Sequence, residues 1–248
     1  MTNNNIYFIA NWKMFGSVKL VNSLNNVISY SKKNKHKAKI VYCPPYTLLK
    51  SFVDKTKNSN IEIGAQDCHI NSDYGPYTGA ISSKMIKDLG AKFVIIGHSE
   101  TREENDNKKI NLKIKSALSK KLNVIFCIGE KLIDKKKNKT KFVLKKQLLE
   151  GLKNLNKLNK VIIAYEPVWS IGTGKVLTNK ELTKQVIIIK KIIKNKFKNQ
   201  KSKIIYGGSV NNQNINNLKQ IKEINGFLIG GASQNSKKFI DIIKKTIN

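Results

Sequence analysis

The feature that most constrains the fold of this 248-residue chain is a regular alternation of strand-like and helix-like segments. Short apolar runs rich in β-branched residues are typical of strands buried on both faces. Such runs occupy residues 6–11, 39–43, 61–66, 92–97, 123–127, 161–166, 203–206 and 226–229. Between them lie segments whose apolar residues recur every three or four positions, which is the period of an amphipathic helix. The predicted helices are residues 17–30, 47–54, 82–89, 107–120, 141–158, 178–198, 213–219 and 236–247.

Strands that alternate with helices pair in parallel, because each helix carries the chain back to the start of the next strand. Eight such units in about 250 residues predict a (β/α)8 barrel, a closed eight-stranded parallel barrel ringed by helices. No linker or shift in composition divides the chain, so residues 1–248 are predicted to form a single domain. An open doubly wound sheet is the alternative, but it usually carries G-x-G-x-x-G after its first strand, and here the first strand runs into Asn-Trp-Lys.

Two local patterns give finer predictions. Thr178 and Glu181 form the Thr-x-x-Glu pattern of a capping box, in which each side chain bonds a free backbone N–H at the start of a helix. Residues 134–139 are almost entirely lysine and are predicted to form a solvated loop.

The formal net charge of +31 admits a second class of function, the binding of nucleic acid or another polyanion. The composition disfavours it: Arg102 is the single arginine, although arginine is the residue that reads bases and phosphates best. Lysine is abundant together with Asn and Ile and is spread along the chain, which favours compositional drift. We therefore expect no nucleic-acid partner.

The same composition predicts a cytoplasmic protein without a membrane partner. No run of 18 apolar residues is present, and the first residues lack the basic start and apolar stretch of a signal peptide. Three cysteines without C-x-x-C spacing argue against a disulfide framework and fit a reducing compartment.

In a parallel barrel the carboxyl ends of the strands meet at one rim, and chemistry is expected there. The first strand ends in Asn11 and is followed by Lys13, the fourth is followed by His98, and the sixth ends in Glu166. Taken singly, a glutamate at a strand end is usually solvated or salt-bridged, and a lysine in so basic a chain is usually on the surface. Together they place an amide, an ammonium, an imidazole and a carboxylate on one rim.

Glycine-rich segments follow the last three strands. Residues 207–209 read Gly-Gly-Ser and 230–233 read Gly-Gly-Ala-Ser, in the positions where barrels often bind phosphate through backbone N–H groups. Gly172 lies in a loop after Glu166 that can close over the rim. A metal site is not expected, because Cys68, His69 and His98 are only a weak set of ligands.

A carboxylate base, an imidazole, a cation and a phosphate cradle suit proton abstraction beside the carbonyl of a small phosphorylated sugar. The carboxylate takes the carbon-bound proton, the imidazole polarises the carbonyl oxygen, and the ammonium stabilises the enediolate. A closing loop excludes water from the intermediate.

Strings of residues along the whole chain resemble the triosephosphate isomerase family. They are NWKM at 11–14, GAQDCH at 64–69, YTG at 77–79, IGHSE at 96–100, CIGE at 127–130, AYEPVWSIGTGK at 164–175, YGGSV at 206–210 and IGGAS at 229–233. The resemblance implies a TIM barrel, a cytoplasmic homodimer of glycolysis and gluconeogenesis, and interconversion of D-glyceraldehyde 3-phosphate and dihydroxyacetone phosphate without a cofactor or metal.

Residue roles are implied by the resemblance, motif by motif. Glu166 is implied to be the base, His98 the electrophile and Lys13 the charge stabiliser, with Asn11 beside the substrate. Residues implied to hold the phosphate are Gly172, Ser209, Gly230 and Gly231. Supporting residues are Glu100 near Lys13, Glu130 beneath the loop, and Thr78, which would brace the active site of the neighbouring subunit.

The chain departs from the family pattern at several positions. Thr101 replaces the first of two arginines that usually come after His-Ser-Glu, and Asn107 stands where the family commonly has glutamate. Both changes point to a lost ion pair near the dimer interface, replaced rather than left half-buried. Ser170 stands where alanine is common. A barrel isomerase for a larger sugar phosphate stays open as an alternative, although the chain is short and the 164–175 string is specific.

Overall fold

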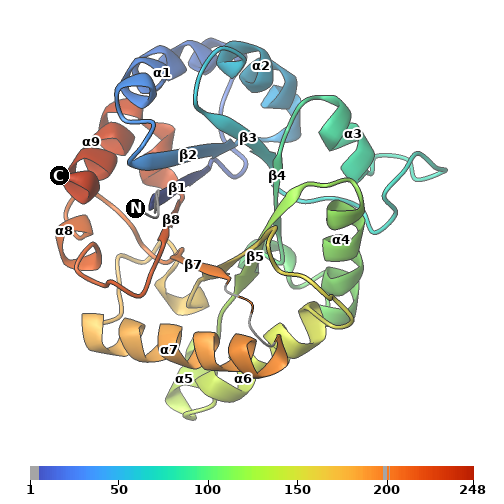
Figure 1. The fold of residues 1–248 in the computed structure, drawn as a ribbon, viewed down its shortest axis with the longest axis vertical. Coiled ribbons are helices and arrows are strands. Elements are labelled where there is room, and N and C mark those ends of the chain that lie inside the picture. Colours follow the sequence, from blue (N-terminus) through green and yellow to red (C-terminus); the bar gives the residue numbers. More distant parts are fainter. Residues whose placement is uncertain (1–5, 198–199, 201) are drawn as a thin grey trace.

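The computed structural model describes residues 6–197, 200 and 202–248, and in this part of the chain the strands form a closed barrel. Each strand pairs in parallel with the next strand along the sequence, and β8 pairs with β1 to close the ring (Figure 1). The strands are β1 (Ile6–Asn11), β2 (Ala38–Cys43), β3 (Glu62–Ala65), β4 (Phe93–Ile96), β5 (Asn123–Ile128), β6 (Val161–Tyr165), β7 (Lys203–Tyr206) and β8 (Gly226–Ile229). The predicted parallel barrel is confirmed, and the open doubly wound alternative is wrong.

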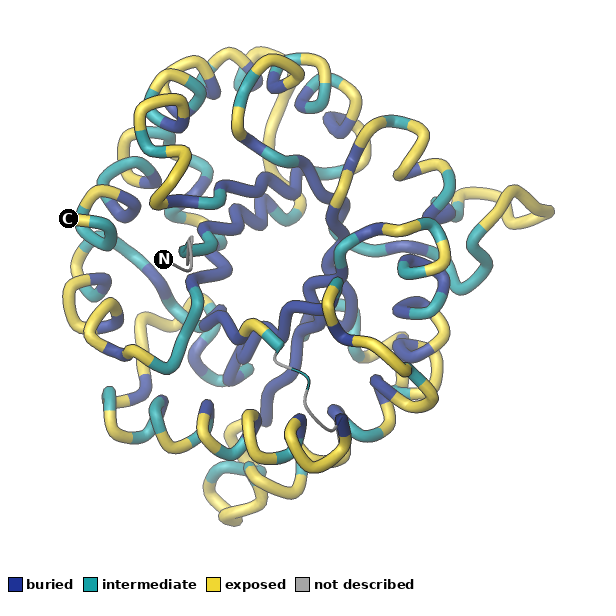
Figure 2. Tube along the Cα trace, in the orientation of Figure 1, coloured by how far each residue is buried: buried dark blue, intermediate teal, exposed yellow. Residues whose placement is uncertain are grey.

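Helices ring the barrel, with buried residues toward the strands and exposed residues outward (Figure 2). The α-helices of the described residues are α1 (Leu24–Lys33), α2 (Tyr46–Thr56), α3 (Ser83–Asp88), α4 (Asn107–Ser119), α5 (Leu132–Lys136), α6 (Thr140–Gly151), α7 (Asn179–Lys196), α8 (Ile215–Leu218) and α9 (Ser236–Ile247). Short 3₁₀ turns are η1 (Val18–Ser23), η2 (Ser99–Thr101), η3 (Val168–Ser170) and η4 (Gly231–Gln234). None of the helices in the described part of the chain is long and apolar enough to cross a membrane.

The helix predicted for residues 17–30 is partly wrong. Its first half is the 3₁₀ turn η1, and the α-helix α1 begins only at Leu24. Val18, Val21 and Leu24 are spaced by three residues, and this spacing lines up on one side of a 3₁₀ helix, which has three residues per turn. Even so, Val18 is exposed, so the buried side starts at Val21.

Two further boundaries differ from the prediction. The lysine-rich run 134–139 is not entirely a loop, because α5 extends to Lys136. The Asp134 carboxylate accepts a hydrogen bond from the Lys131 N–H (3.2 Å) and so stabilises the start of that helix. Helix α6 ends at Gly151 rather than Leu158, and Asn154 then turns the chain with a left-handed φ of 59°.

The capping box before α7 is confirmed. The Thr178 hydroxyl accepts a hydrogen bond from the Glu181 N–H (3.2 Å), and the Glu181 carboxylate accepts one from the Thr178 N–H (2.9 Å). The helix continues to Lys196; the predicted end at Lys198 lies outside the described residues.

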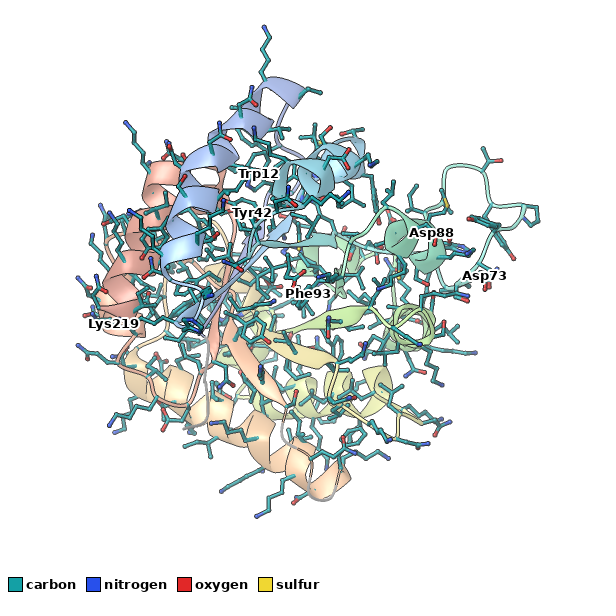
Figure 3. All side chains as sticks on the ribbon, turned by 45° about the horizontal axis from the view of Figure 1, so that its top comes forward. Trp12, Tyr42, Asp73, Asp88, Phe93 and Lys219 are labelled. Atoms are coloured by element: carbon teal, nitrogen blue, oxygen red, sulfur yellow. The ribbon has the colours of Figure 1, made fainter. Side chains whose placement is uncertain are left out.

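Alternate residues of each strand face opposite sides of the sheet and form two buried layers. The outer layer packs against the helices. There Tyr42 of β2 meets Trp12, which follows β1, and Phe52 of α2, with ring centroids 4.9–6.1 Å apart; Figure 3 labels Trp12 and Tyr42. The other layer is a separate buried cluster that includes Ile9, Ala164 and other alternate strand residues. Because side chains alternate along a strand, this second layer fills the inside of the barrel.

Side chains two residues further along a strand point to the same side, so the residues that follow the inward-facing ones lie at the rim of the barrel. Asn11 comes two residues after Ile9, Glu166 two after Ala164, and Gly207 two after Ile205. These residues therefore lie over the interior cluster at the carboxyl end of the barrel, and all three line one cavity.

Candidate active site

Glu166 is the central group of the cavity at the carboxyl end of the barrel. Its N–H continues the sheet by donating to the Ile128 carbonyl (2.8 Å), and Pro167 then ends the ladder. The side chain is 3% exposed, and its Oε2 has no hydrogen-bond partner within the described residues. A buried carboxylate oxygen without a donor is a proton acceptor held ready for a ligand.

Burial raises the pKa of Glu166, because a low-dielectric surrounding disfavours the carboxylate. The nearby His98, a hydrogen bond from Cys127 and the Lys13 ammonium partly offset this effect, and Glu100 adds to it. Burial and the Glu166 charge also raise the pKa of the Cys127 thiol. Cys127 is therefore a neutral thiol beside Glu166.

Two glycines make room for the Glu166 carboxylate and its backbone. A Cβ on Gly207 would lie 2.7 Å from both Cγ and Oε1 of Glu166. A Cβ on Gly129 would lie 1.8 Å from the Glu166 carbonyl oxygen. Residues 207 and 129 thus lie just beyond the neighbouring strands β7 and β5, where the chain approaches the base too closely for any side chain.

His98 faces Glu166 across the cavity, with Nε2 3.7 Å from Oε1. Alternation along β4, whose Phe93 and Ile95 face the interior, would point the His98 side chain outward. It faces the cavity instead because Gly97, with a left-handed φ of 77°, turns the chain just before it. The Glu100 N–H donates to His98 Nδ1 (3.2 Å). An accepting Nδ1 places the proton of a neutral imidazole on Nε2, so His98 presents an N–H donor to the cavity.

Lys13 is held beside these groups by its backbone and by its charge. It has a left-handed φ of 56°, which is uncommon outside glycine. The Asn11 amide oxygen accepts its N–H (3.0 Å), and Gln66 donates to its carbonyl (2.8 Å). Its ammonium pairs with the Glu100 carboxylate. Such strained backbone persists only where surrounding contacts hold it, and it is frequent at functional sites.

Another part of the cavity lining is glycine-rich backbone. Gly230 precedes the 3₁₀ turn η4 and Gly231 is its first residue; the Ser233 N–H donates to the Gly230 carbonyl (2.8 Å). The N–H groups ahead of that bond have no partner within the turn and suit an anion. Gly172 and Ser209 also line the cavity.

The cavity has a volume of about 240 Å³, slightly below the usual range for ligand sites. Residues predicted from the sequence make up more than half of its lining: Asn11, Lys13, His98, Glu166, Gly172, Ser209, Gly230 and Gly231. A carboxylate, an imidazole and an ammonium therefore share one small space with a glycine-rich anion-binding wall.

Glu130 lies behind this cavity and does not line it. It is buried and accepts hydrogen bonds from Trp169 Nε1 (2.9 Å) and the Tyr165 hydroxyl (3.2 Å). The Nζ atom of Lys135, a residue of the unpredicted helix α5, lies 3.9 Å from the centroid of the Trp169 ring. Burial raises the pKa of Glu130, although these donors oppose the effect. Glu130 thus anchors the start of the loop that carries Gly172.

Thr78 is not brought to the cavity. It is exposed at a turn in the segment between β3 and α3, which projects from the barrel wall in Figure 1.

The uncharged side chains of Thr101 and Asn107 both form hydrogen bonds. The Thr101 hydroxyl donates to the His98 carbonyl (3.0 Å). Asn107 accepts from the Arg102 guanidinium (2.9 Å) and donates to Glu150 (2.8 Å). An amide therefore bridges the single arginine of the chain to a carboxylate through hydrogen bonds.

Sequence reasoning missed several residues that act on the site through contact. Gln66, which donates to the Lys13 carbonyl, is the last residue of the strand predicted at 61–66. A search for polar residues at the carboxyl ends of strands could therefore have found it. Gly207 belongs to a glycine pair noted for its position after the seventh strand, but its close approach to Glu166 was not predicted. Cys127 carried no sequence signal, because its position below Glu166 arises from the pairing of β5 with β6.

The raised pKa of Glu166 gives a testable pH dependence. We expect its carboxyl group to titrate above 4.5, the ordinary value for glutamic acid, because ionisation is penalised by burial. Since the folded-state pKa exceeds the unfolded one, this group contributes most to stability at low pH, and that contribution is lost as the pH rises through the folded pKa. Activity that needs the carboxylate falls in the opposite direction, as the pH is lowered.

Carbon-13 NMR of protein labelled at glutamate carboxyl carbons measures this titration directly. The Glu166 signal is assigned by its absence from Glu166→Gln protein. A midpoint at or below 4.5 for that signal contradicts the expectation.

No group of three or more His, Cys, Asp or Glu side chains suited to a metal is found among the described residues. The three cysteines Cys43, Cys68 and Cys127 are free and buried.

Comparison with known proteins identifies relatives over nearly the full length of the chain. The family model described as triosephosphate isomerase matches residues 6–246. A triosephosphate isomerase of Dictyoglomus thermophilum is 42% identical over 242 residues, covering 95% of this chain and 97% of its own. One from Dictyostelium discoideum is 39% identical over 254 residues, covering 100% of this chain and 98% of its own. The crystal structure of triosephosphate isomerase from Bartonella henselae superposes with a TM-score of 0.89 at 33% identity, covering 97% of this chain and 98% of the other.

Proposed function

Because the chain belongs to the triosephosphate isomerase family and is an isomerase that interconverts triose phosphates, we propose that the cavity at the carboxyl end of its barrel is the site of that reaction. The observation that carries the assignment is the buried Glu166 carboxylate facing His98 Nε2 at 3.7 Å, with Lys13 in the same lining. We further propose that residues 1–248 are one domain, which the family match over 6–246 supports.

In the proposed reaction Glu166 removes the proton from the carbon next to the carbonyl. The electron pair of the broken C–H bond forms the carbon–carbon double bond of an enediolate, and the carbonyl oxygen gains negative charge. His98 supports that charge through its Nε2–H and moves a proton between the two oxygens. Glu166 then returns its proton to the neighbouring carbon, which completes the interconversion of ketose and aldose.

Lys13 and Asn11 are proposed to stabilise the charge and orient the substrate oxygens. The ion pair of Lys13 with Glu100 holds the ammonium in place without removing it from the cavity. Gly172, Ser209, Gly230 and Gly231 are proposed to bind the phosphate, and the small volume of the cavity that they line supports a small phosphorylated substrate rather than a larger sugar.

The assay that tests this function couples conversion of D-glyceraldehyde 3-phosphate to a dehydrogenase that consumes dihydroxyacetone phosphate. Turnover by the purified protein is the expected result. An absence of turnover in protein that is folded by circular dichroism contradicts the proposed function.

We also propose that the protein acts as a homodimer in the cytoplasm. The free, buried cysteines support a reducing compartment. The dimer is supported by large apolar side chains left on the surface of the projecting segment between β3 and α3, namely Tyr74 and Tyr77, which lies beside Thr78. Exposed apolar clusters of this kind are typical of protein interfaces. In the proposed dimer Thr78 braces the neighbouring active site.

The dimer proposal predicts that Tyr77→Asp raises the dissociation constant of the dimer at least about tenfold, because a charge would be buried at the interface. We expect sedimentation to show monomers and the assay to show lost activity at the same protein concentrations. Phe142→Asp is the matched control, since Phe142 is a 66% exposed aromatic residue on α6, far along the chain. A fully active monomer, or an unchanged dimer in Tyr77→Asp, contradicts the proposal.

A further inference from the structure

Ser170 occupies an unusual place for a polar residue. It is the last residue of the 3₁₀ turn η3 and is 0% exposed. The next two residues, Ile171 and Gly172, line the cavity. The Ser170 side chain is therefore buried next to the residues that line the cavity at the proposed phosphate site.

Its hydroxyl group makes contacts with three separate parts of the chain. The O–H donates to the Lys175 carbonyl (2.5 Å) at the far end of the loop. The oxygen is 3.2 Å from the Tyr206 hydroxyl at the end of β7, and it accepts the Ser209 N–H at 3.4 Å. A hydroxyl has one proton and two lone pairs, so these partners use its full capacity when Tyr206 donates.

The packing around this hydroxyl is tight. A Cβ on Gly208 would lie 2.8 Å from Ser170 Oγ and 2.2 Å from the Tyr206 hydroxyl. The loop start, the loop end and the segment after β7 thus meet at one oxygen atom.

We propose that Ser170 is a positioning residue that latches the segment 167–177 over the cavity by joining both ends of the loop to the Tyr206–Ser209 segment. It touches neither reacting atoms nor phosphate; it acts by holding Gly172 in the wall. An alanine here cannot supply this link, so the latch is a property of the serine. The inference rests on the proposed function only in that the substrate phosphate binds the wall that contains Gly172.

Ser170→Ala tests the latch. Without it the covering conformation is less populated, and the apparent affinity for substrate falls by the same factor. We expect KM for D-glyceraldehyde 3-phosphate to rise about fivefold, the effect of one net hydrogen bond, with kcat changed less than about twofold.

Limited trypsin digestion provides a readout that does not depend on catalysis. Cleavage after Lys175, measured by mass spectrometry on the native protein, is expected to become at least about threefold faster relative to cleavage after Lys57, an exposed site beyond α2. Ser31→Ala is the matched control, because Ser31 is a buried serine on α1 whose hydroxyl also bonds a backbone carbonyl (2.8 Å). It is expected to leave both KM and cleavage after Lys175 unchanged.

The outcomes separate the latch from the enzyme function. Faster cleavage together with a raised KM in Ser170→Ala alone supports the proposal. Unchanged cleavage after Lys175, or equal effects in Ser31→Ala, overturns it. Wild-type protein that shows no turnover contradicts the function, whereas the digestion still decides whether Ser170 holds the loop.

Discussion

Replacement of Glu166 by glutamine is expected to lower kcat about 10³-fold, because an amide of nearly the same shape cannot accept the carbon-bound proton. The carboxylate is the sole acid group placed in the lining of the cavity, and its free oxygen has no other partner among the described residues. KM is expected to change little, since phosphate binding is proposed for Gly172, Ser209, Gly230 and Gly231 rather than for Glu166. The coupled assay measures both constants.

The matched control for this loss is Glu62→Gln. Glu62 is a partly buried carboxylate at the other end of the barrel, where Lys39 and Lys92 each approach to 2.9 Å. Its replacement is expected to lower the melting temperature and to leave kcat unchanged. Full activity in Glu166→Gln, or a comparable loss of kcat in Glu62→Gln, would show that the base is misassigned.

The second large effect is expected from Gly207→Ala. The added methyl group would lie 2.7 Å from Cγ and Oε1 of Glu166, so the carboxylate must move away from its place opposite His98. A displacement of about 1 Å at a reacting group costs on the order of 10²-fold in rate. We therefore expect kcat to fall about 10²-fold with all proposed catalytic residues still present.

Gly151→Ala distinguishes a displaced base from general crowding. A Cβ on Gly151 would lie 2.4 Å from the Phe126 ring, in the layer between strands and helices. This variant is expected to lose stability, measured by thermal unfolding, and to keep its kcat. If Gly207→Ala keeps wild-type kcat, the carboxylate tolerates displacement and its geometry is not critical.

The role of Glu166 depends on residues that the sequence identifies, whereas the effect of Gly207 depends on a tertiary contact. Glu166 could be selected from the sequence, because it ends a buried apolar run and Asn11, Lys13 and His98 stand at the ends of other predicted strands. The effect of Gly207 could not, because it depends on the pairing of β6 with β7, which brings two residues 41 positions apart in sequence into contact. In the sequence that glycine belongs to a pair in a position where barrels often bind phosphate, and nothing local indicates its close approach to Glu166.

Errors in the predicted helices have a similar origin. Residues 134–139 were predicted to be a loop from their charge, yet Asp134 and the packing of Lys135 on Trp169 favour a short helix there. The helix predicted to reach Leu158 ends at Gly151, although Leu152 and Leu158 beyond it are buried. The spacing of apolar residues predicts which residues are buried, but it does not predict whether the backbone that carries them is helical or irregular.

The amino-acid sequence alone established the barrel, the rim residues Asn11, Lys13, His98 and Glu166, and the family. These depend on alternation along the chain and on the residue types directly after each strand, and both are local properties. The tertiary structure was needed for the close approach of Gly207 to the base and for the Ser170 hydroxyl that joins three segments. Such contacts depend on distances between strands that are far apart in sequence, and those distances exist only once the barrel has closed.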